Sequence, residues 1–384
     1  MSKSILEIYN PLKTILKNKS KGLHDPIFMG NEKKYLNNCI SSGYVSSVGN
    51  FVNKFEKDVS KYTKSKFTTA TNSGTSALHL ILKYYNINSN DEVLLPSLTY
   101  VATINSILYC NSNPNFIDVN QNTMGVCPKK LERYLKKISV KRKSHYINKK
   151  TGKRLRALVV VHLYGFPCEI LKIKKICKKY KIVLIEDAAE AFGTFYKKKH
   201  LGTFGDAGIL SFNGNKPITA GSGGMILTNI KALAFKTKHL STHAKKPSLK
   251  DHIHDQVGYN YRMTNLSAAV GCAQLENIKK ILNAKKINFK KYDDKFSSNN
   301  YIKILKEPKY SKSNYWLITG LLKKKNDKKP LLIFLRKKGY ICRSIWRPLH
   351  TLKIFKNFPH DSLDTTMDLY SRAINFPSSP SISY

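Results

Sequence analysis

The sequence predicts an α/β fold built on a mostly parallel seven-stranded sheet, and two observations predict it. Seven short apolar runs recur between residues 67 and 228, and helical patterns separate several of them. Runs that are apolar throughout are typical of strands buried on both faces, as in parallel sheets covered by helices. The seven runs are residues 67–71, 92–95, 115–119, 157–163, 181–187, 207–212 and 224–228.

The chain divides into three parts by composition and pattern. Residues 1–22 are polar and lysine-rich and are expected to form an N-terminal arm, and residues 23–265 form the large domain that holds the sheet. Residues 266–384 are expected to form a linking helix and a smaller C-terminal α+β domain. Within this last part, one long helix is expected over 266–296 and strands near 315–321 and 340–345. Helices are also expected over 31–40 and 51–59.

The net charge first suggests a nucleic-acid-binding protein. The chain has 384 residues, with 67 lysines and arginines against 24 acidic residues, which gives +43. Only nine of the basic residues are arginine, the residue of bidentate phosphate recognition, and the lysines run along nearly the whole chain. A coding bias towards lysine explains this pattern better, so no nucleic-acid partner is expected. The densest basic run, 136–156, predicts an inserted hairpin or loop on the domain rim rather than a specific binding surface.

The cysteines and apolar runs indicate a cytoplasmic protein. The seven cysteines include no C-x-x-C pair and no zinc spacing, so a reducing compartment and no metal site are expected. The N-terminal residues lack the apolar core of a signal peptide, and no apolar run approaches the roughly 18 residues that span a bilayer. No membrane association is expected.

The first candidate site is the segment 71–78, where a strand candidate ends and a helix candidate begins. Gly74 permits a tight turn, and Thr75 and Ser76 place hydroxyls beside the free N–H groups of the first helical turn. Such a helix start binds phosphate, because the unpaired amides and the helix dipole both favour an anion. An ordinary N-cap explains the same residues equally well.

Two further candidates follow along the chain. Asp187 ends a strand candidate, at the sheet edge where ligands of open α/β sheets bind, although it could equally cap the next helix. Lys216 lies in a loop between two strand candidates, five residues after Ser211. A desolvated lysine has a lowered pKa and can attack a carbonyl, whereas by residue type alone it is more simply a solvated surface lysine.

The three candidates together predict a pyridoxal 5'-phosphate site. Asp187 would hold the proton on the pyridine nitrogen, which makes the ring an electron sink. Lys216 would hold the aldehyde as a Schiff base and then move a proton between carbon atoms. The helix start at Gly74 and Ser211 would hold the phosphate.

The sequence resembles the DegT/DnrJ/EryC1/StrS family of sugar aminotransferases from about residue 23 to 380. Five segments carry the resemblance in the family's order: TNSGTSALHL, DEVLLPSLTYVATINSI, IEDAAEAFGT, GILSFNGNKPITAGSGGMILTN and GYNYRMTNLSAAVGCAQLE. It implies the pyridoxal-phosphate-dependent fold type I and a homodimer with shared active sites. The implied roles are Lys216 as the Schiff-base lysine, Asp187 as the ring-nitrogen partner, Tyr100 stacked on the ring, Glu190 near its phenolic oxygen, Gly74, Thr75, Ser76 and Ser211 at the phosphate, and Asn260 reaching the phosphate of the partner subunit.

Lys216 argues against the family's dehydrases, which carry histidine at that place. Glu190, where many relatives have Gln or His, and Pro217 depart from the usual pattern, and a carboxylate beside a phenolate is repulsive unless one is protonated or a water intervenes.

A narrower resemblance lies in LHDPIFMGNEKKYL, SSGYVSSVG, YINKKTGKRLRA and SFNGNK. It favours amination by L-glutamate of the C4 ketone of a nucleotide-linked 4-keto-6-deoxy-N-acetylhexosamine, as for legionaminic acid or bacillosamine. The basic run 136–156 would then lie near the anionic nucleotide. The alternatives are a C3-aminotransferase, or a 4-aminotransferase of another 4-keto-6-deoxy sugar, as for perosamine or viosamine. A non-catalytic basic nucleic-acid-binding protein on this fold is a remote alternative.

Overall fold

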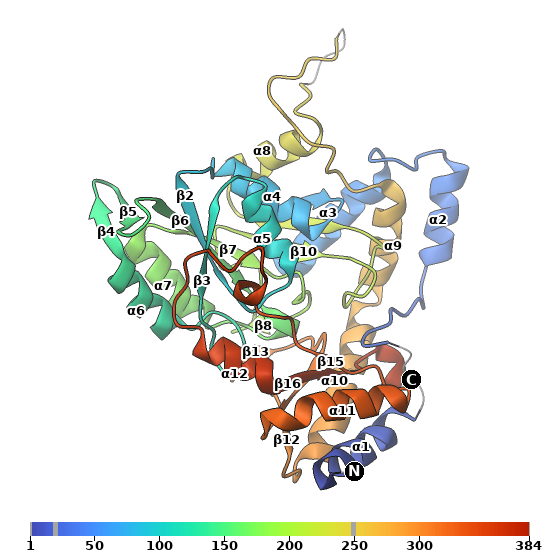
Figure 1. Cartoon of the computed structure of the whole chain (residues 1–384). Helices are drawn as coiled ribbons and strands as arrows, with labels where there is room; N and C mark the ends of the chain where they lie inside the picture. Colours follow the sequence, from blue (N-terminus) through green and yellow to red (C-terminus); the bar gives the residue numbers. More distant parts are fainter. Residues whose placement is uncertain (1, 18–21, 247–250, 384) are drawn as a thin grey trace.

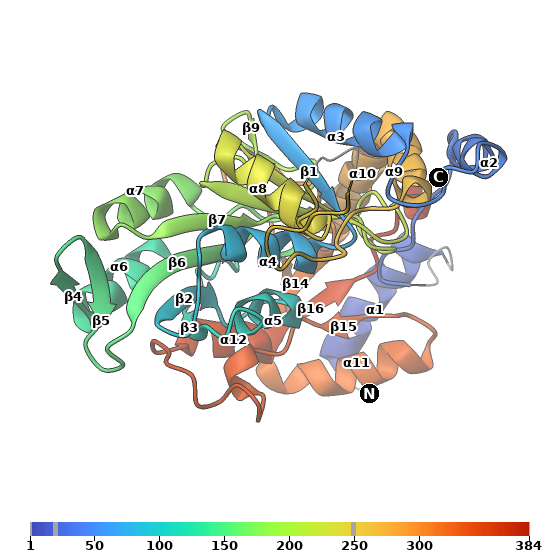
Figure 2. The same ribbon diagram turned by 90° about the horizontal axis from the view of Figure 1, so that it is seen from above.

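A computed structural model describes residues 2–17, 22–246 and 251–383 of the chain. Its large sheet has nine strands, seven of them in the order β1-β11-β10-β7-β6-β2-β3 (Figures 1 and 2). Only β11 runs against the other six, so the sheet is mostly parallel, as the sequence predicts. The seven strands match the seven apolar runs: β1 (Phe67–Thr71), β2 (Asp91–Pro96), β3 (Asn113–Ile117), β6 (Arg154–Val161), β7 (Val183–Asp187), β10 (Ala207–Ser211) and β11 (Gly224–Thr228).

Helices cover both faces of this sheet, which explains why most of its strands are rich in buried apolar residues. Successive side chains of β6 enter different cores, Leu158 and Val160 on one face and Ala157 and Val159 on the other. The first core is closed by α3 (Asn50–Thr63), α6 (Pro128–Ile138), α7 (Ile170–Tyr180) and α9 (Asn265–Glu276). The second is closed by α4 (Gly74–Tyr84), α5 (Val101–Leu108) and α8 (Lys231–Ser241).

The C-terminal residues form the smaller α+β unit, below the large sheet in Figure 1. Its antiparallel sheet has the order β12-β14-β16-β15. Its elements are α10 (Ile278–Phe296), β12 (Ile302–Ile304), β14 (Ile318–Leu322), α11 (Lys328–Lys337), β15 (Arg343–Ser344), α12 (Asp364–Arg372) and β16 (Ala373–Phe376). The short strands β8 (Phe195–Tyr196), β9 (Lys199–His200) and β13 (Ser311–Lys312) form a third sheet that links the two units.

The expectation of one long helix over 266–296 is wrong, because the helix is interrupted at Asn277. This residue leaves helical geometry, with φ −99° and ψ 7°, and its side-chain amide donates to the carbonyl of Ala273 at 3.2 Å. Asparagine side chains compete in this way with the backbone hydrogen bonds of a helix. The segment therefore forms two helices, of which α9 packs on the large domain and α10 leads into the small one.

Residues 3–16 form the helix α1 (Lys3–Leu16), which packs on the small unit next to α10 and α11 (Figure 1). Ile5, Ile8, Leu12 and Ile15 recur at helical spacing and are buried in the same core as Tyr292 of α10. Within the residues that the structure describes, the N-terminal segment is thus a helix docked on the small unit. Another predicted helix forms as α2 (Glu32–Ser41), at the periphery in both views.

The basic insertion forms a hairpin, as predicted, from β4 (Ser139–Arg142) and β5 (His145–Asn148). Buried Glu92 anchors it by accepting hydrogen bonds from Asn148 and Thr151. The hairpin joins the sheet at Arg154, which begins β6. Val161 lies seven positions further along β6, a distance of about 23 Å, so the insertion lies at the amino edge of the strands.

The described helices include none with the length and apolar character that crossing a membrane requires. Among the same residues, no group of three or more histidine, cysteine or acidic side chains is arranged to hold a metal ion.

Candidate active site

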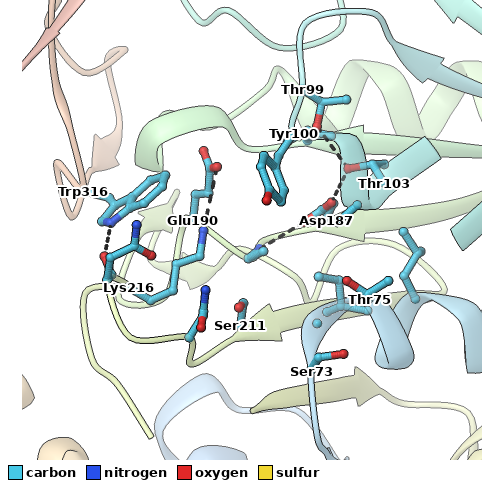
Figure 3. Close-up of a pocket in the computed structure, with 18 of the residues that line it drawn as sticks. Ser73, Thr75, Thr99, Tyr100, Thr103, Asp187, Glu190, Ser211, Lys216 and Trp316 are labelled. Carbon is cyan, nitrogen blue, oxygen red and sulfur yellow. Dashed lines mark hydrogen bonds and ion pairs between the residues drawn. The ribbon is translucent and has the colours of Figure 1, made fainter. Parts of the chain in front are cut away.

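A cavity of about 540 Å³ opens at the carboxyl ends of β7 and β10, against the N-terminus of α4. This is the place where ligands bind in open α/β sheets. Seven of the nine residues predicted for the site line this cavity (Figure 3). They are Gly74, Thr75, Tyr100, Asp187, Glu190, Ser211 and Lys216.

The floor of the cavity is suited to a phosphate group. Ser73 caps α4 and accepts the amide hydrogen of Ser76 at 3.1 Å, so the amides of Gly74 and Thr75 remain as the helix-end donors that face the cavity. A side chain on Gly74 would place its Cβ only 3.2 Å from the Cβ of Ser211. Glycine at this position therefore lets α4 approach the end of β10 and brings the amides to the Ser211 hydroxyl.

Two predicted site residues do not line the cavity. The Ser76 hydroxyl is bonded to Ser73 at 2.8 Å and donates to Asn72 at 2.6 Å. Asn260 has an exposed side chain, and its backbone carbonyl accepts from the Asn72 amide at 3.2 Å, just outside the site. Within one subunit, Ser76 braces the turn, and Asn260 is not one of the residues that line the cavity.

Asp187 contributes a buried carboxylate to the lining of the cavity, beside Tyr100 in Figure 3. The Thr103 hydroxyl donates to its Oδ2 at 2.9 Å, and the Ala189 amide donates to its Oδ1 at 3.1 Å. Burial raises the pKa of Asp187, while these two hydrogen bonds and the charge of Lys216 limit the rise. A fixed, desolvated carboxylate interacts strongly with a cationic ring nitrogen placed against it.

Lys216 reaches the cavity from the loop after β10. Its side chain is 12% exposed, and its Nζ lies 3.8 Å from Oε1 of Glu190. Burial lowers the pKa of Lys216, and the carboxylates of Glu190 and Asp187 limit the fall. The lowered pKa suits an amine that must be neutral to attack a carbonyl, and the nearby carboxylates suit an amine that must also accept a proton.

Glu190 has its carboxylate held on both oxygens. The Tyr164 amide donates to Oε2 at 2.8 Å, and the indole of Trp346 donates to Oε1 at 3.3 Å. Tyr164 adopts a positive φ of 54°, an uncommon conformation for a residue other than glycine, and this aims its amide at Glu190. Burial raises the pKa of Glu190, and Lys216 is the main opposing influence.

The structure adds residues that sequence patterns did not single out. Trp316, Arg343 and Trp346 enter the cavity from the small unit, together with Ser73 and Thr103 from the large one. The chain has two tryptophans, and both line this cavity. Their scarcity is a signal that could have found them, whereas Arg343 carries no local motif.

Comparison with known proteins identifies the family. Residues 27–384 match the DegT/DnrJ/EryC1/StrS aminotransferase family. The chain is 36% identical over 366 residues to "GDP-perosamine synthase" of Escherichia coli O157:H7, covering 94% of each chain. It is 34% identical over 276 residues to "UDP-4-amino-4,6-dideoxy-N-acetyl-beta-L-altrosamine transaminase" of Campylobacter jejuni, covering 71% of this chain and 69% of the relative.

Solved structures agree with this result. The aminotransferase PseC of Helicobacter pylori, involved in the biosynthesis of pseudoaminic acid, superposes with a TM-score of 0.84 at 26% identity and covers 93% of each chain. The fold and the site define a pyridoxal-phosphate-dependent aminotransferase of fold type I. The chain belongs to the DegT/DnrJ/EryC1/StrS aminotransferase family and is a nucleotide-sugar aminotransferase.

The residues present fit the cofactor of this family. The amides of Gly74 and Thr75 at the helix start can hold its phosphate, the buried Asp187 lines the same cavity, and Lys216 offers a desolvated amine. The cavity volume lies in the range of small-molecule sites.

Proposed function

We propose that this protein transfers the amino group of L-glutamate to the C4 ketone of a GDP-linked 4-keto-6-deoxyhexose, as in perosamine formation. The similarity to the E. coli enzyme supports this substrate, because it extends over 94% of both chains. The match to the N-acetyl-altrosamine transaminase covers only 71% of this chain. These relatives favour the perosamine type over the N-acetylhexosamine type, which the shorter motifs suggested and which stays the second candidate.

The single observation that carries the proposed amine transfer is the placement of Lys216, Asp187 and the α4 N-terminus around one cavity. When bound, pyridoxal phosphate supplies an electron sink for the removal of a proton from the carbon that bears nitrogen. Lys216 would move that proton at Nζ. Asp187, fixed by Thr103, would hold the proton of the ring nitrogen at its carboxylate.

The remaining residues position and bind. The exposed face of Tyr100, whose side chain is 52% exposed, would cover the ring of the cofactor. Arg343 lines the cavity, and none of the ion pairs among the described residues involves it. We infer that it receives an anionic group of a substrate, either the carboxylate of glutamate or a phosphate of the nucleotide.

We also propose a homodimer in which each subunit completes the other's site. The helix α2 and the loop after it expose several apolar side chains next to one another in sequence, a feature typical of interfaces. These are Ile40 at 65% exposure, Tyr44, Val45 and Val48. In such a dimer Asn260, which does not line its own cavity, would reach the phosphate of the partner.

A spectrum tests the role of Lys216 directly. The protein purified with cofactor is expected to show the visible absorption band of a lysine-bound pyridoxal group. The Lys216→Ala variant should lose this band and all amine transfer, whereas Lys285→Met removes another buried amine and should keep the band. An unchanged spectrum in Lys216→Ala would overturn the assignment.

A further inference from the structure

The amine of Lys216 lies between two groups that favour its charged form. On one side, Oε1 of Glu190 is 3.8 Å from Nζ. On the other, the ring centroid of Trp316 is 3.9 Å from the same Nζ, so that the amine faces the indole (Figure 3). An ammonium over an indole face is attracted by the negative charge of the ring's π-system, and the neutral amine is not.

Trp316 is fixed in this position from several directions. It is 2% exposed, and its indole N–H donates to the backbone carbonyl of Asn215 at 2.6 Å. Asn215 precedes Lys216, so the ring is tied to the loop that carries the lysine. The backbone carbonyl of Trp316 accepts from the Ser378 hydroxyl at 2.6 Å and from Nζ of Lys285 at 2.8 Å.

Lys285 is a buried amine with no counter-ion. It is 1% exposed and donates to the carbonyl of Trp316 and to both oxygens of Ser378, at 2.6 and 3.0 Å. No carboxylate of the described residues lies within ion-pair distance of it, and burial lowers the pKa of Lys285. Buried lysines are rare, and the three acceptors account for all the hydrogens of this one.

The other ionisable groups near Lys216 come from three elements. Glu190 and Asp187 approach from the end of β7 and the turn that follows it, and both favour the ammonium. His24, on the segment before α2, is buried beside Lys216 and Lys285, and burial together with these two amines lowers the pKa of His24 well below its usual value. The neutral His24 therefore adds no charge, and the indole is the uncharged group that favours the protonated lysine.

We propose that Trp316 stabilises the protonated form of Lys216 and that Lys285 positions Trp316 for this contact. The inference rests on the proposed role of Lys216 as the residue that carries the proton. Within each half of the reaction Lys216 takes a proton from one carbon atom and delivers it to another, so its amine must hold that proton in between. Burial alone would expel this proton to solvent, and the indole face and Glu190 oppose that loss.

The test measures the protonation of Lys216 in the full-length protein without cofactor. Acetic anhydride modifies neutral amines only, so the extent of labelling of the Lys216 peptide against pH, read by mass spectrometry, gives a midpoint. Trp316→Leu removes the ring and should lower this midpoint by about one pH unit, with Trp316→Phe giving a smaller shift. Lys285→Met removes the amine but keeps an unbranched side chain that is one atom shorter, and it should shift the midpoint in the same direction by less.

Tyr315→Leu is the matched control. Tyr315 is the buried aromatic residue directly before Trp316. Its ring stacks on that of Phe289, with 3.9 Å between the ring centroids, and it does not line the cavity. Its loss should lower stability without moving the midpoint. A midpoint that stays unchanged or rises in folded Trp316→Leu and Trp316→Phe would overturn the role of Trp316. An unchanged midpoint in Lys285→Met alone would overturn its positioning role. The labelling of Lys216 does not depend on turnover. A wild-type protein that transfers no amine would therefore count against the proposed function and not against the role of Trp316.

Discussion

At the scale of single residues, the buried carboxylate of Asp187 suits the proposed amine transfer, but burying its charge lowers the stability of the folded protein. Its carboxylate is buried, and among the described residues only Thr103 and Ala189 donate to it. Exchange for asparagine keeps the shape and removes the charge. We expect Asp187→Asn to bind the cofactor and to lose turnover by about a hundredfold or more, because the ring nitrogen loses its proton partner. Steady-state amine transfer measures this, and wild-type rates would exclude the role.

The same substitution has a pH-dependent effect on the cofactor-free protein. Burial raises the pKa of Asp187 in the folded state above the unfolded value of about 3.9. Its favourable contribution is therefore present at low pH and is lost as the pH rises through the folded pKa. Melting temperatures measured from about pH 4 upward should show Asp187→Asn gaining on the wild type by roughly a few degrees, until the pH exceeds the raised pKa of Asp187. A gap that narrows with rising pH would contradict this.

Single residues also show where sequence reasoning succeeds and where it stops. Asp187 and Lys216 could be predicted because each follows a buried strand, and strand ends converge in a parallel sheet. Trp316 and Trp346 could not, because they come from the small unit, and the approach of that unit to the cavity has no local signature. The position of Ser76 beside Gly74 and Thr75 in sequence predicts a contact with the phosphate. In the structure its hydroxyl instead bonds to Ser73 and Asn72 within the turn.

At the scale of elements, the approach of β11 to the start of α4 shapes the phosphate site. A Cβ on Gly224 would lie 2.3 Å from the carbonyl oxygen of Ser73 and 2.6 Å from the amide nitrogen of Gly74. We expect Gly224→Ala to displace the helix start, to cost about 1–3 kcal/mol of stability, and to weaken cofactor binding about tenfold. Equilibrium unfolding and cofactor titration measure the two effects.

Gly214→Ala is the control for this prediction. It lies in the loop that carries Lys216, but the nearest atom to its added Cβ is the carbonyl oxygen of Gly221 at 3.9 Å. Its cofactor affinity should equal that of the wild type. Equal losses in both variants would mean that the close approach at Gly224 is not what forms the site.

The basic hairpin β4–β5 is predicted to be dispensable for substrate binding. It joins β6 at Arg154, whereas the cavity is reached at Val161, the other end of the strand. The double substitution Lys141→Gln and Arg142→Gln should leave the KM for the nucleotide sugar unchanged. Arg343→Gln, inside the cavity, should raise the KM of an anionic substrate several-fold. A raised KM in the hairpin variant alone would restore the expectation that the insertion attracts the nucleotide.

The elements themselves were predictable to different degrees. All seven central strands could be recognised from their apolar runs, and six of them place buried apolar side chains in both cores, whereas β1 contributes only Ala70 to one of them. The break between α9 and α10 depends on one asparagine side chain that bonds back to its own helix, and the apolar period continues through it. The docking of α1 on α10 joins residues nearly 300 positions apart, which no local pattern encodes.

At the scale of the whole molecule, the proposed dimer predicts complementation between inactive variants. Each shared site would take Lys216 from one subunit and Asn260 from the other. In a mixed dimer of one Lys216→Ala subunit and one Asn260→Ala subunit, both substitutions therefore fall in the same site. The other site of that dimer then contains intact Lys216 and intact Asn260. Mixing and reassociating the two variants should restore up to about a quarter of wild-type activity. A monomer in solution, or no gain on mixing, would contradict shared sites.

Only part of the net charge of +43 concerns the proposed site. Its densest run lies at the amino edge of the strands, away from the cavity. The cations that matter for the proposed chemistry are Lys216 and Arg343, which line the cavity.

The transfer of labelled nitrogen tests the central claim most directly. The protein is incubated with ¹⁵N-glutamate and a panel of nucleotide-linked 4-keto-6-deoxy sugars, and the products are read by mass spectrometry. We predict that the label enters the GDP-linked 4-keto-6-deoxyhexose in preference to the UDP-linked N-acetylhexosamine, and that Lys216→Ala transfers none. Preference for the N-acetylated sugar would overturn the perosamine-type assignment, and the absence of label in every sugar would contradict the proposed aminotransferase activity towards 4-keto sugars.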